Sequence, residues 1–485
     1  MVPVHKRVTS YIAPSVQEIR TASQAARSTP GRLGLLQLPR GKGRHSPRNS
    51  FLQPRLAHLV RFTCPVDALH LQSDTSFTSE LLAVLPNSLT ELELQTFLTD
   101  IWFWEKLQET QGLPLNLSSA CFLALQDTAP HLSALRRLSS LRSLSLPVHA
   151  TLHKCDLESL AAIRDLQGLE VTFRDSVSQA DSPFLAPDAS FSILAPLTSL
   201  TMAGSRICHL AGAAQLSRLM RLSVTGTTSL SLHGVQQSAA LKHLRLTNVH
   251  LSQSGLAMLQ TLHTLKTLES LALGHVTFPS SASILRFATL WELSTLKSLD
   301  VRRCGSLSYD WADDEGRNIS MLTQFIFEIV STTDREGLAA PGLNQLRYLS
   351  KVHLVSCKMA PDVIPDTLGS LLFLSDLLIV IWGRDAPAAP AKPIDISALA
   401  LLGPNIAEIT IRGRVQLLAR CSLLQLAAQP RLHSFRVFEH LDEAKPRIST
   451  DATSWLHCAA LFHALLNRPH KRLPAVSLMP DLSRL

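Results

Sequence analysis

The sequence predicts an α/β solenoid of about 16 repeats, with a parallel β-sheet on its concave face and helices on its convex face. A recurring spacing is the first observation: two aliphatic residues separated by two variable ones, then one variable residue and a third aliphatic residue, repeated from Val66 to Leu478. Composition is the second, because 46% of the chain is hydrophobic and only 5% is aromatic. Such a profile suits a core that stacks aliphatic side chains again and again.

Each copy of this spacing contains a candidate strand. The last three residues alternate with a period of two, which predicts a short strand with one buried face. After the strand the chain turns, and apolar residues then follow a helical spacing, as at Leu256 and Leu259. One strand and one helix cannot bury their apolar sides alone, so neighbouring units must stack. The clearer copies begin at Leu89, Leu141, Leu219, Leu241, Leu268, Leu296, Leu349, Leu374, Ile406, Leu432 and Leu473, and weaker copies begin at Val66, Ala120, Leu166, Leu197 and Leu322.

These repeats resemble the leucine-rich-repeat family, whose consensus is L-x-x-L-x-L-x-x-N/C-x-L. The resemblance covers about 85% of the chain. Cys304 and Cys357 occupy the Asn/Cys position in two repeats, as in the cysteine-containing subtype, which implies α-helices on the convex side. Other repeats carry Thr227, Val249 or Val276 there, so the internal ladder of Asn side chains is largely missing.

The first 65 residues differ from the rest of the chain. They contain eleven Lys and Arg but one acidic residue, Glu18, whereas the remainder is close to neutral. An Arg- and Ser-rich, acid-poor segment is typical of an organelle transit peptide, and it is also compatible with a basic tail or with a disordered leader. We therefore divide the chain into a basic leader, residues 1–65, and a solenoid, residues 66–485, and we expect a mitochondrial or else a cytoplasmic protein.

The sequence offers no motif for catalysis. It contains no GxSxG, P-loop, HExxH or GxGxxG pattern, and its eight cysteines form no CxxC pair. His457, Cys458 and His463 lie close together, but their spacing matches no common zinc site. We expect no enzyme, no cofactor, no metal, no small-molecule substrate and no membrane span.

Variable positions of the strands point away from the core and form the candidate partner-binding face. Across successive repeats these positions favour basic side chains, which predicts attraction to an acidic protein surface or to RNA phosphates. A solvated surface without a partner is the alternative. The candidate residues are Arg142, Arg221, Lys242, His243, Arg245, Lys297, Arg302, Arg303, Lys351, His353, Arg412 and Arg436, interrupted by Glu269, Asp300, Glu408 and Glu439.

Three segments interrupt the repeats and are expected to be insertion loops, at residues 175–192, 306–318 and 383–395. Insertions in a solenoid emerge on one face, which is often the binding face. The loop at 306–318 combines acidic residues with Tyr309 and Trp311, and exposed aromatic side chains are common anchors in interfaces. The alternative is a tolerated surface loop with no partner.

Three functions are compatible with this organisation. The first is a non-enzymatic scaffold that binds a protein, such as a subunit or assembly factor of a mitochondrial complex. The second is the substrate-recognition subunit of an SCF-type ubiquitin ligase, because the cysteine-containing subtype often follows an F-box; the segment before Val66 is too basic and irregular for one. The third is an RNA-associated role in ribosome assembly or RNA processing.

Overall fold

The structure is a computed structural model of residues 1–485, and it consists of two compact units, Met1–Leu241 and Lys242–Leu485. Each unit is described by itself. The residues described are 36–38, 68–71, 89–94, 116–122, 132–148, 151–173, 183–204, 207–210, 212–232, 234–278, 285–286, 293–304, 307–308, 321–328, 346–355, 368–381, 392–395, 399, 401–413, 415–418 and 429–438.

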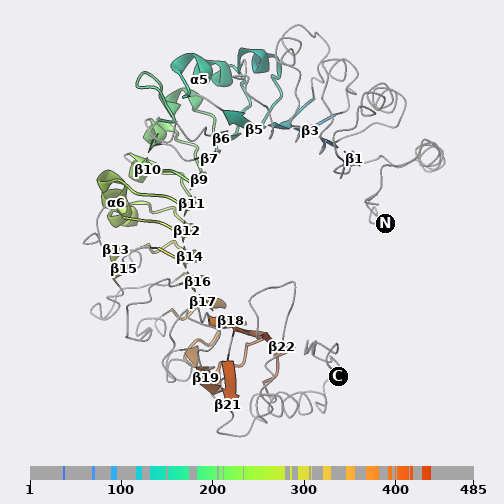
Figure 1. Ribbon diagram of the computed structural model, residues 1–485, viewed down its shortest axis with the longest axis vertical. Helices are drawn as coiled ribbons and strands as arrows, with labels where there is room; N and C mark the ends of the chain where they lie inside the picture. The colour runs from blue at the N-terminus through green and yellow to red at the C-terminus, as the bar shows by residue number, and fades with distance from the viewer. Residues whose placement is uncertain are drawn as a thin grey trace, which may run out of the picture. The chain divides into compact units, whose positions relative to one another are not determined.

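The first unit is built on a parallel sheet with one strand per repeat (Figure 1). The strands pair in chain order, and equivalent residues face each other, so that Leu200 in one strand pairs with Leu169 and Leu222 in its neighbours. The strands are β1 (Leu36–Leu38), β2 (Ala68–Leu71), β3 (Glu91–Leu94), β4 (Ser119–Phe122), β5 (Ser143–Val148), β6 (Gly168–Phe173), β7 (Ser199–Ala203) and β9 (Arg221–Thr225).

The second unit repeats this arrangement. Leu271 pairs with Leu244 and Leu299, again in chain order and in the same register. The strands of this sheet are β11 (His243–Thr247), β12 (Ser270–Gly274), β14 (Ser298–Arg302), β16 (Gln324–Glu328), β17 (Lys351–Val355), β18 (Asp376–Ile381), β20 (Glu408–Gly413) and β22 (Ser434–Phe438).

Shorter elements lie on the other side of each repeat, away from the long sheet. In Figure 1, α5 (Lys154–Ala161) and α6 (Gln253–Gln260) lie there, together with one-turn 3-10 helices such as Leu262–Thr264. Pairs of short parallel strands also form there: β8 (Ile207–His209) with β10 (Ser229–Ser231), β13 (Leu285–Arg286) with β15 (Leu307–Ser308), and β19 (Lys392–Asp395) with β21 (Val415–Leu418).

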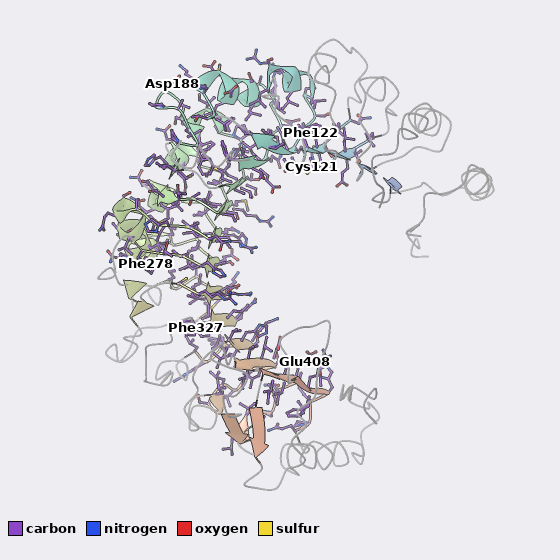
Figure 2. All side chains as sticks on the ribbon, viewed as in Figure 1. Cys121, Phe122, Asp188, Phe278, Phe327 and Glu408 are labelled. Atoms are coloured by element: carbon purple, nitrogen blue, oxygen red, sulfur yellow. The ribbon has the colours of Figure 1, made fainter. Side chains whose placement is uncertain are left out.

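The core lies between these two layers and consists mainly of the predicted leucines. Figure 2 shows side chains filling the space between the strands and the outer turns of each unit. Leu200, Leu222 and Leu271 are each 1% exposed or less, and Phe325 and Phe327 stack in the second unit with ring centroids 5.7 Å apart. The predicted parallel solenoid is confirmed, while the predicted repeat at Leu473 lies outside the described residues.

One predicted register is wrong. The spacing that begins at Ala120 predicts a strand through Leu125, but β4 is Ser119–Phe122; its Ala120 and Phe122 are buried, and so is Leu117 just before it. Leu117 lies three residues before Ala120 and also satisfies the pattern. Pairing of Ala120 with Leu92 and Leu144 selects the earlier alternative, because a parallel sheet requires equivalent residues to face each other.

Two further segments differ from the sequence-based expectations. Leu36–Leu38 form a strand that pairs with Leu69–Leu71, so the sheet begins inside the stretch assigned to the basic leader. Within the expected insertion at 175–192, Phe184 and Phe191 are each 1% exposed, and the Phe184 ring lies 4.2 Å from that of Phe173. This part of the segment is a packed outer turn rather than an exposed loop.

The residue that follows each strand near the middle of the chain adopts a left-handed backbone conformation. Gly204 and Gly226 have φ values of 138° and 79°, and Asn248, His275 and Arg303 have values of 53°, 53° and 49° at the equivalent position. Non-glycine residues pay a steric cost in this region. The exit turn therefore demands a particular backbone geometry whether or not the sequence provides glycine.

Candidate partner-binding face

The outward side chains of the long sheet form what we call the open face of each unit. In the second unit, strand pairing aligns these side chains into rows that run from one repeat to the next. Glu408, labelled in Figure 2, begins the open-face positions of β20. The central row consists of Arg245, Ala272, Asp300, Ile326, His353, Leu378, Thr410 and Arg436.

The first charged cluster lies where β11, β12 and β14 begin. Glu269 accepts from Lys297, with Oε2 2.8 Å from Nζ, and its Oε1 lies 3.3 Å from Nζ of Lys242. The hydrogen bond from Lys297 and then that from Lys242 lower the pKa of Glu269. One acidic residue thus bridges two predicted binding lysines.

Arg302 is also paired. Its guanidinium donates two hydrogen bonds to the Asp300 carboxylate, from Nε at 2.7 Å and from Nη2 at 3.0 Å. This two-pronged geometry is the strongest that an arginine and a carboxylate can make. Arg302 therefore faces a ligand as half of an ion pair, not as an isolated positive charge.

A third cluster gathers around Asp376 at the start of β18. Its Oδ2 lies 3.1 Å from Nζ of Lys351 and 3.5 Å from Nε2 of His353 on the neighbouring strand. The His353 hydrogen bond, followed by that of Lys351, holds the pKa of Asp376 below its usual range, although burial opposes the shift. Farther along, Nε2 of His433 lies 3.8 Å from Glu408.

The remaining predicted residues have different surroundings. Arg221 and Arg245 are exposed, His243 is half-buried, and Arg303 occupies the left-handed turn after β14. Nε of Arg436 is buried and has no hydrogen-bond partner in the described part of the chain. Arg142 is exposed just before β5, and Arg412 belongs to β20. Tyr309 and Trp311 lie outside the described residues.

An apolar strip that the repeat spacing does not predict also lies on this open face. Ile326, Leu378 and Val380 occupy outward positions, as does Val355, which pairs with Val380. Ile326 and Val380 are 7% and 6% exposed, while Leu378 and Val355 are half-buried. The run Leu377–Ile381 is aliphatic at every position, and this loss of alternation was a signal that both faces of β18 are apolar.

Hydroxyl groups connect the repeats at the edge where the strands begin. Thr323 Oγ1 donates to the Lys297 carbonyl at 3.1 Å, Ser350 Oγ to the Thr323 carbonyl at 3.0 Å, and Ser375 Oγ to the Ser350 carbonyl at 2.9 Å. The family resemblance implies a ladder of Asn or Cys side chains at the other end of the strands. There, Cys304 Sγ donates to the Leu273 carbonyl at 3.4 Å, and burial raises the pKa of this thiol to about 12.

The described residues contain neither a metal-binding cluster nor a helix that could span a membrane. No group of three or more His, Cys, Asp or Glu side chains is placed to hold a metal ion there. His457, Cys458 and His463 lie outside those residues. Within the same part of the chain, no helix has the length and apolar content needed to cross a bilayer.

No protein-family model and no curated protein matches this chain. Among solved structures, it is similar to an internalin (inlF) from Listeria monocytogenes, at 13% identity and a TM-score of 0.39, over 88% of this chain and 89% of that one. A leucine-rich-repeat protein of Leptospira interrogans is similar at 16% identity and 0.46, over 83% and 94%. TLR13 in its complex with ssRNA13 is similar at 16% and 0.43, over 82% and 62%.

These solved structures are all leucine-rich-repeat proteins, as the spacing in the sequence predicts. At such identities the similarity concerns the fold and not a partner. The cysteine-containing subtype and the number of repeats stay predictions.

Proposed function

We propose that this leucine-rich-repeat solenoid is a non-enzymatic scaffold that binds a protein partner through the open face of the unit Lys242–Leu485. The proposal rests on one observation: four basic residues of this face, Lys242, Lys297, Arg302 and Lys351, are paired with carboxylates, and the pairs flank an apolar strip. Lys242 and Lys297 contact Glu269, while Lys351 contacts Asp376. Ile326, Val355, Leu378 and Val380 make up the strip between and beside them.

Charge pairing favours protein over RNA as the partner. A phosphate backbone is held by cations that are free to replace its counterions, and a lysine bound to a carboxylate is a poor replacement. Mixed ion pairs around apolar side chains are, by contrast, the ordinary composition of a protein interface. Arg245 is exposed in the same outward row, three strands away from Ile326, and is suited to a charged position at the margin of such an interface.

Site-specific photo-crosslinking tests this function. Benzoylphenylalanine replaces Leu378 in the tagged full-length chain, expressed in the cells from which the protein comes, and crosslinked products are identified by mass spectrometry. We expect one protein to be captured from position 378 but not from the matched open-face position Thr201 of the first unit. Products that disappear on ribonuclease treatment would instead establish RNA as the partner.

The alternative of an RNA-associated role has its own test. Under the protein-binding proposal, the double substitution Arg245→Glu/Arg302→Glu should leave the affinity of the full-length protein for a labelled oligouridylate unchanged, because neither side chain is then a phosphate contact. A weaker affinity together with a shallower salt dependence would favour RNA binding.

A mitochondrial location is part of the proposal and is supported by the basic composition of residues 1–65. Leu36–Leu38 pair with β2, so a cleavage that leaves the sheet intact must fall before Leu36. Mass spectrometry of the mature amino terminus from purified mitochondria checks this. An intact Met1 in a cytosolic fraction would contradict the import proposal without touching the scaffold function.

A further inference from the structure

Exposed apolar side chains gather at one edge of the second unit. The described residues include six large hydrophobic side chains that are clearly exposed, and five of them fall between residues 321 and 401. They are Met321 at 49%, Tyr348 at 51%, Leu372 at 61%, Phe373 at 51% and Leu401 at 56%; the sixth is Met220 at 39%. A local concentration of this kind marks interaction sites more often than scattered apolar residues do.

Three of the five occupy one repeat position, which we call the rim row. It is the residue directly before the first core aliphatic residue of each repeat, and in successive repeats of the second unit it is Met321, Tyr348, Phe373, Asn405 and Arg431. Because β16, β17, β18, β20 and β22 are neighbours in the sheet, these residues follow one another along the edge. The Tyr348 and Phe373 rings stack with centroids 5.9 Å apart.

The fold does not need apolar side chains in the rim row. At the same position in other repeats, Ser140 donates to the Leu117 carbonyl at 3.1 Å and Thr295 donates to the Leu268 carbonyl at 2.9 Å. Asn405 does the same toward the Leu372 carbonyl at 2.8 Å. This hydrogen bond connects one repeat to the previous one, so a polar residue is the structurally useful choice.

The repeats with an apolar rim residue make this connection elsewhere. Thr323, Ser350 and Ser375, each two residues after Met321, Tyr348 and Phe373 respectively, donate their hydroxyls to carbonyls of the preceding repeat at 2.9 to 3.1 Å. In these repeats the hydrogen bond to the preceding repeat therefore does not depend on the rim position. Exposed apolar groups are retained there at a cost in solvation, which points to a binding role.

The charges around the rim row are positive. Arg347 adjoins Tyr348, and Arg431 ends the row; both are exposed, and neither has a carboxylate partner in the described part of the chain. The nearby carboxylates are engaged on the open face, Asp376 with Lys351 and His353, and Glu408 with His433. A ligand that supplies carboxylates beside an apolar stripe would complement this surface.

We propose that the rim row binds an acidic amphipathic helix of a partner protein. Strands in a sheet are about 4.8 Å apart, and the two stacked rings lie 5.9 Å apart, so the row repeats at close to the 5.4 Å pitch of an α-helix. A helix laid along the row places apolar residues at i, i+3 or i+4, and i+7 over Met321, Tyr348 and Phe373. Acidic residues on its flanks then reach Arg347 and Arg431.

Other occupants fit the rim row less well. Single-stranded nucleic acid needs open ring faces and a track of cations, whereas here the two rings cover each other and aliphatic Leu372 and Leu401 lie alongside. A second copy meeting this edge in a twofold contact would bring the Arg347 side chains of both copies toward one surface, and like charges oppose that contact. The rim row and the open-face strip are different sets of residues, so this proposal does not need a partner on the open face.

Peptide binding to the full-length protein tests the proposal. The probe is a fluorescein-labelled synthetic helix with leucine at i, i+3, i+4 and i+7 and glutamate on its flanks, and a companion peptide carries lysine in place of every glutamate. Fluorescence anisotropy gives both affinities. We expect the acidic peptide to bind at least about tenfold more tightly, and the double variant Tyr348→Ser/Phe373→Ser to lose at least about tenfold of that affinity.

Three variants separate the rim row from general effects. Met220→Ser removes an exposed apolar residue outside the row and should leave binding unchanged, as should Thr201→Ala on the open face of the first unit. Arg347→Glu/Arg431→Glu should reverse the preference, so that the lysine peptide binds better; a purely structural role of these arginines would not produce that reversal. Circular dichroism confirms that each variant is folded.

The proposal is overturned by any of four results. The acidic peptide does not bind, or both peptides bind equally, or the serine double variant retains the affinity. The fourth is that the same double variant loses oligouridylate binding, or loses the concentration-dependent self-association measured by sedimentation. The first loss would assign the row to RNA, and the second would assign it to a second copy.

Discussion

The open faces of the two units differ, although the same repeat builds both. In the first unit the central outward row includes Ser145, Glu170, Thr201 and Ser223, which are mostly small hydroxyl residues. The equivalent row of the second unit combines Arg245, Asp300 and His353 with Ile326 and Leu378. Inward residues are apolar in both. Alternate residues of one strand therefore have separate roles: the inward set builds the core, and the outward set gives each unit its own surface.

The largest expected effect tests whether the inward positions are equivalent in the two units. Leu200→Ala and Leu271→Ala remove leucines that are fully buried at the same repeat position. Each should destabilise the fold by about 2–5 kcal/mol, because both leave a cavity in close-packed core. Urea unfolding followed by circular dichroism measures this, with exposed Leu372→Ala as a control that should cost little. A small effect at only one of the two buried leucines would show that the inward positions of the two units are not equivalent.

The next largest effect concerns the residue that follows each strand, where substitution should change the free energy of unfolding with opposite signs in the two units. A Cβ at Gly204 would lie 2.7 Å from Cβ of Phe173, and its φ is 138°, so Gly204→Ala should destabilise the first unit by about 1–3 kcal/mol. Arg303 has a φ of 49° although it carries a full side chain. Arg303→Gly should therefore raise the free energy of unfolding by up to about 1 kcal/mol through relieved strain. The greater conformational entropy of glycine in the unfolded chain reduces this gain. Thermal unfolding of both variants distinguishes these signs. Destabilisation by Arg303→Gly would mean that the side chain's contacts outweigh the strain.

The smallest effect concerns the paired charges of the second unit. The pKa of Asp376 is lowered, so the stability it contributes is complete above its unfolded pKa near 3.8 and is lost as the pH falls through the folded pKa. Asp376→Asn should therefore cost below about 1 kcal/mol at pH 7 and flatten the loss of stability on acidification.

Unfolding at pH 7 and at a pH below 3.8 measures this difference. Glu170→Gln is the matched control, because Glu170 is an exposed outward carboxylate of the first unit with no basic partner in the described residues. A larger pH effect at Glu170 than at Asp376 would remove the distinction between the two open faces.

The spacing of aliphatic residues predicts most of this fold but leaves two registers to the structure. The residues before β4 satisfy the pattern from Leu117 and from Ala120, and only pairing with β3 and β5 separates the two. β1 follows the same rule through Leu33, Leu36 and Leu38, yet the surrounding basic composition masked it. Local patterns are reliable where a repeat is flanked by clear copies, because sheet register is a property of neighbours.

The candidate face was predicted in part. Alternation correctly assigns Arg245, Asp300 and His353 to outward positions, since strand periodicity is local. It does not reveal that the acidic residues interrupting the basic row are the partners of its lysines. Lys297 and Glu269 are 28 residues apart, and only the stacking of repeats brings them within 2.8 Å.

By itself, the sequence determined most of the inward positions of the strands, because the hydrophobic effect acts on each side chain and the period of two specifies its face. Tertiary structure alone decided which outward groups meet. It paired Lys242, Lys297, Arg302 and Lys351 with carboxylates, aligned Ile326, Val355, Leu378 and Val380 into one strip, and stacked Tyr348 on Phe373 at the rim. Such contacts depend on the register between repeats that are distant along the chain, and that register follows from packing rather than from any local pattern.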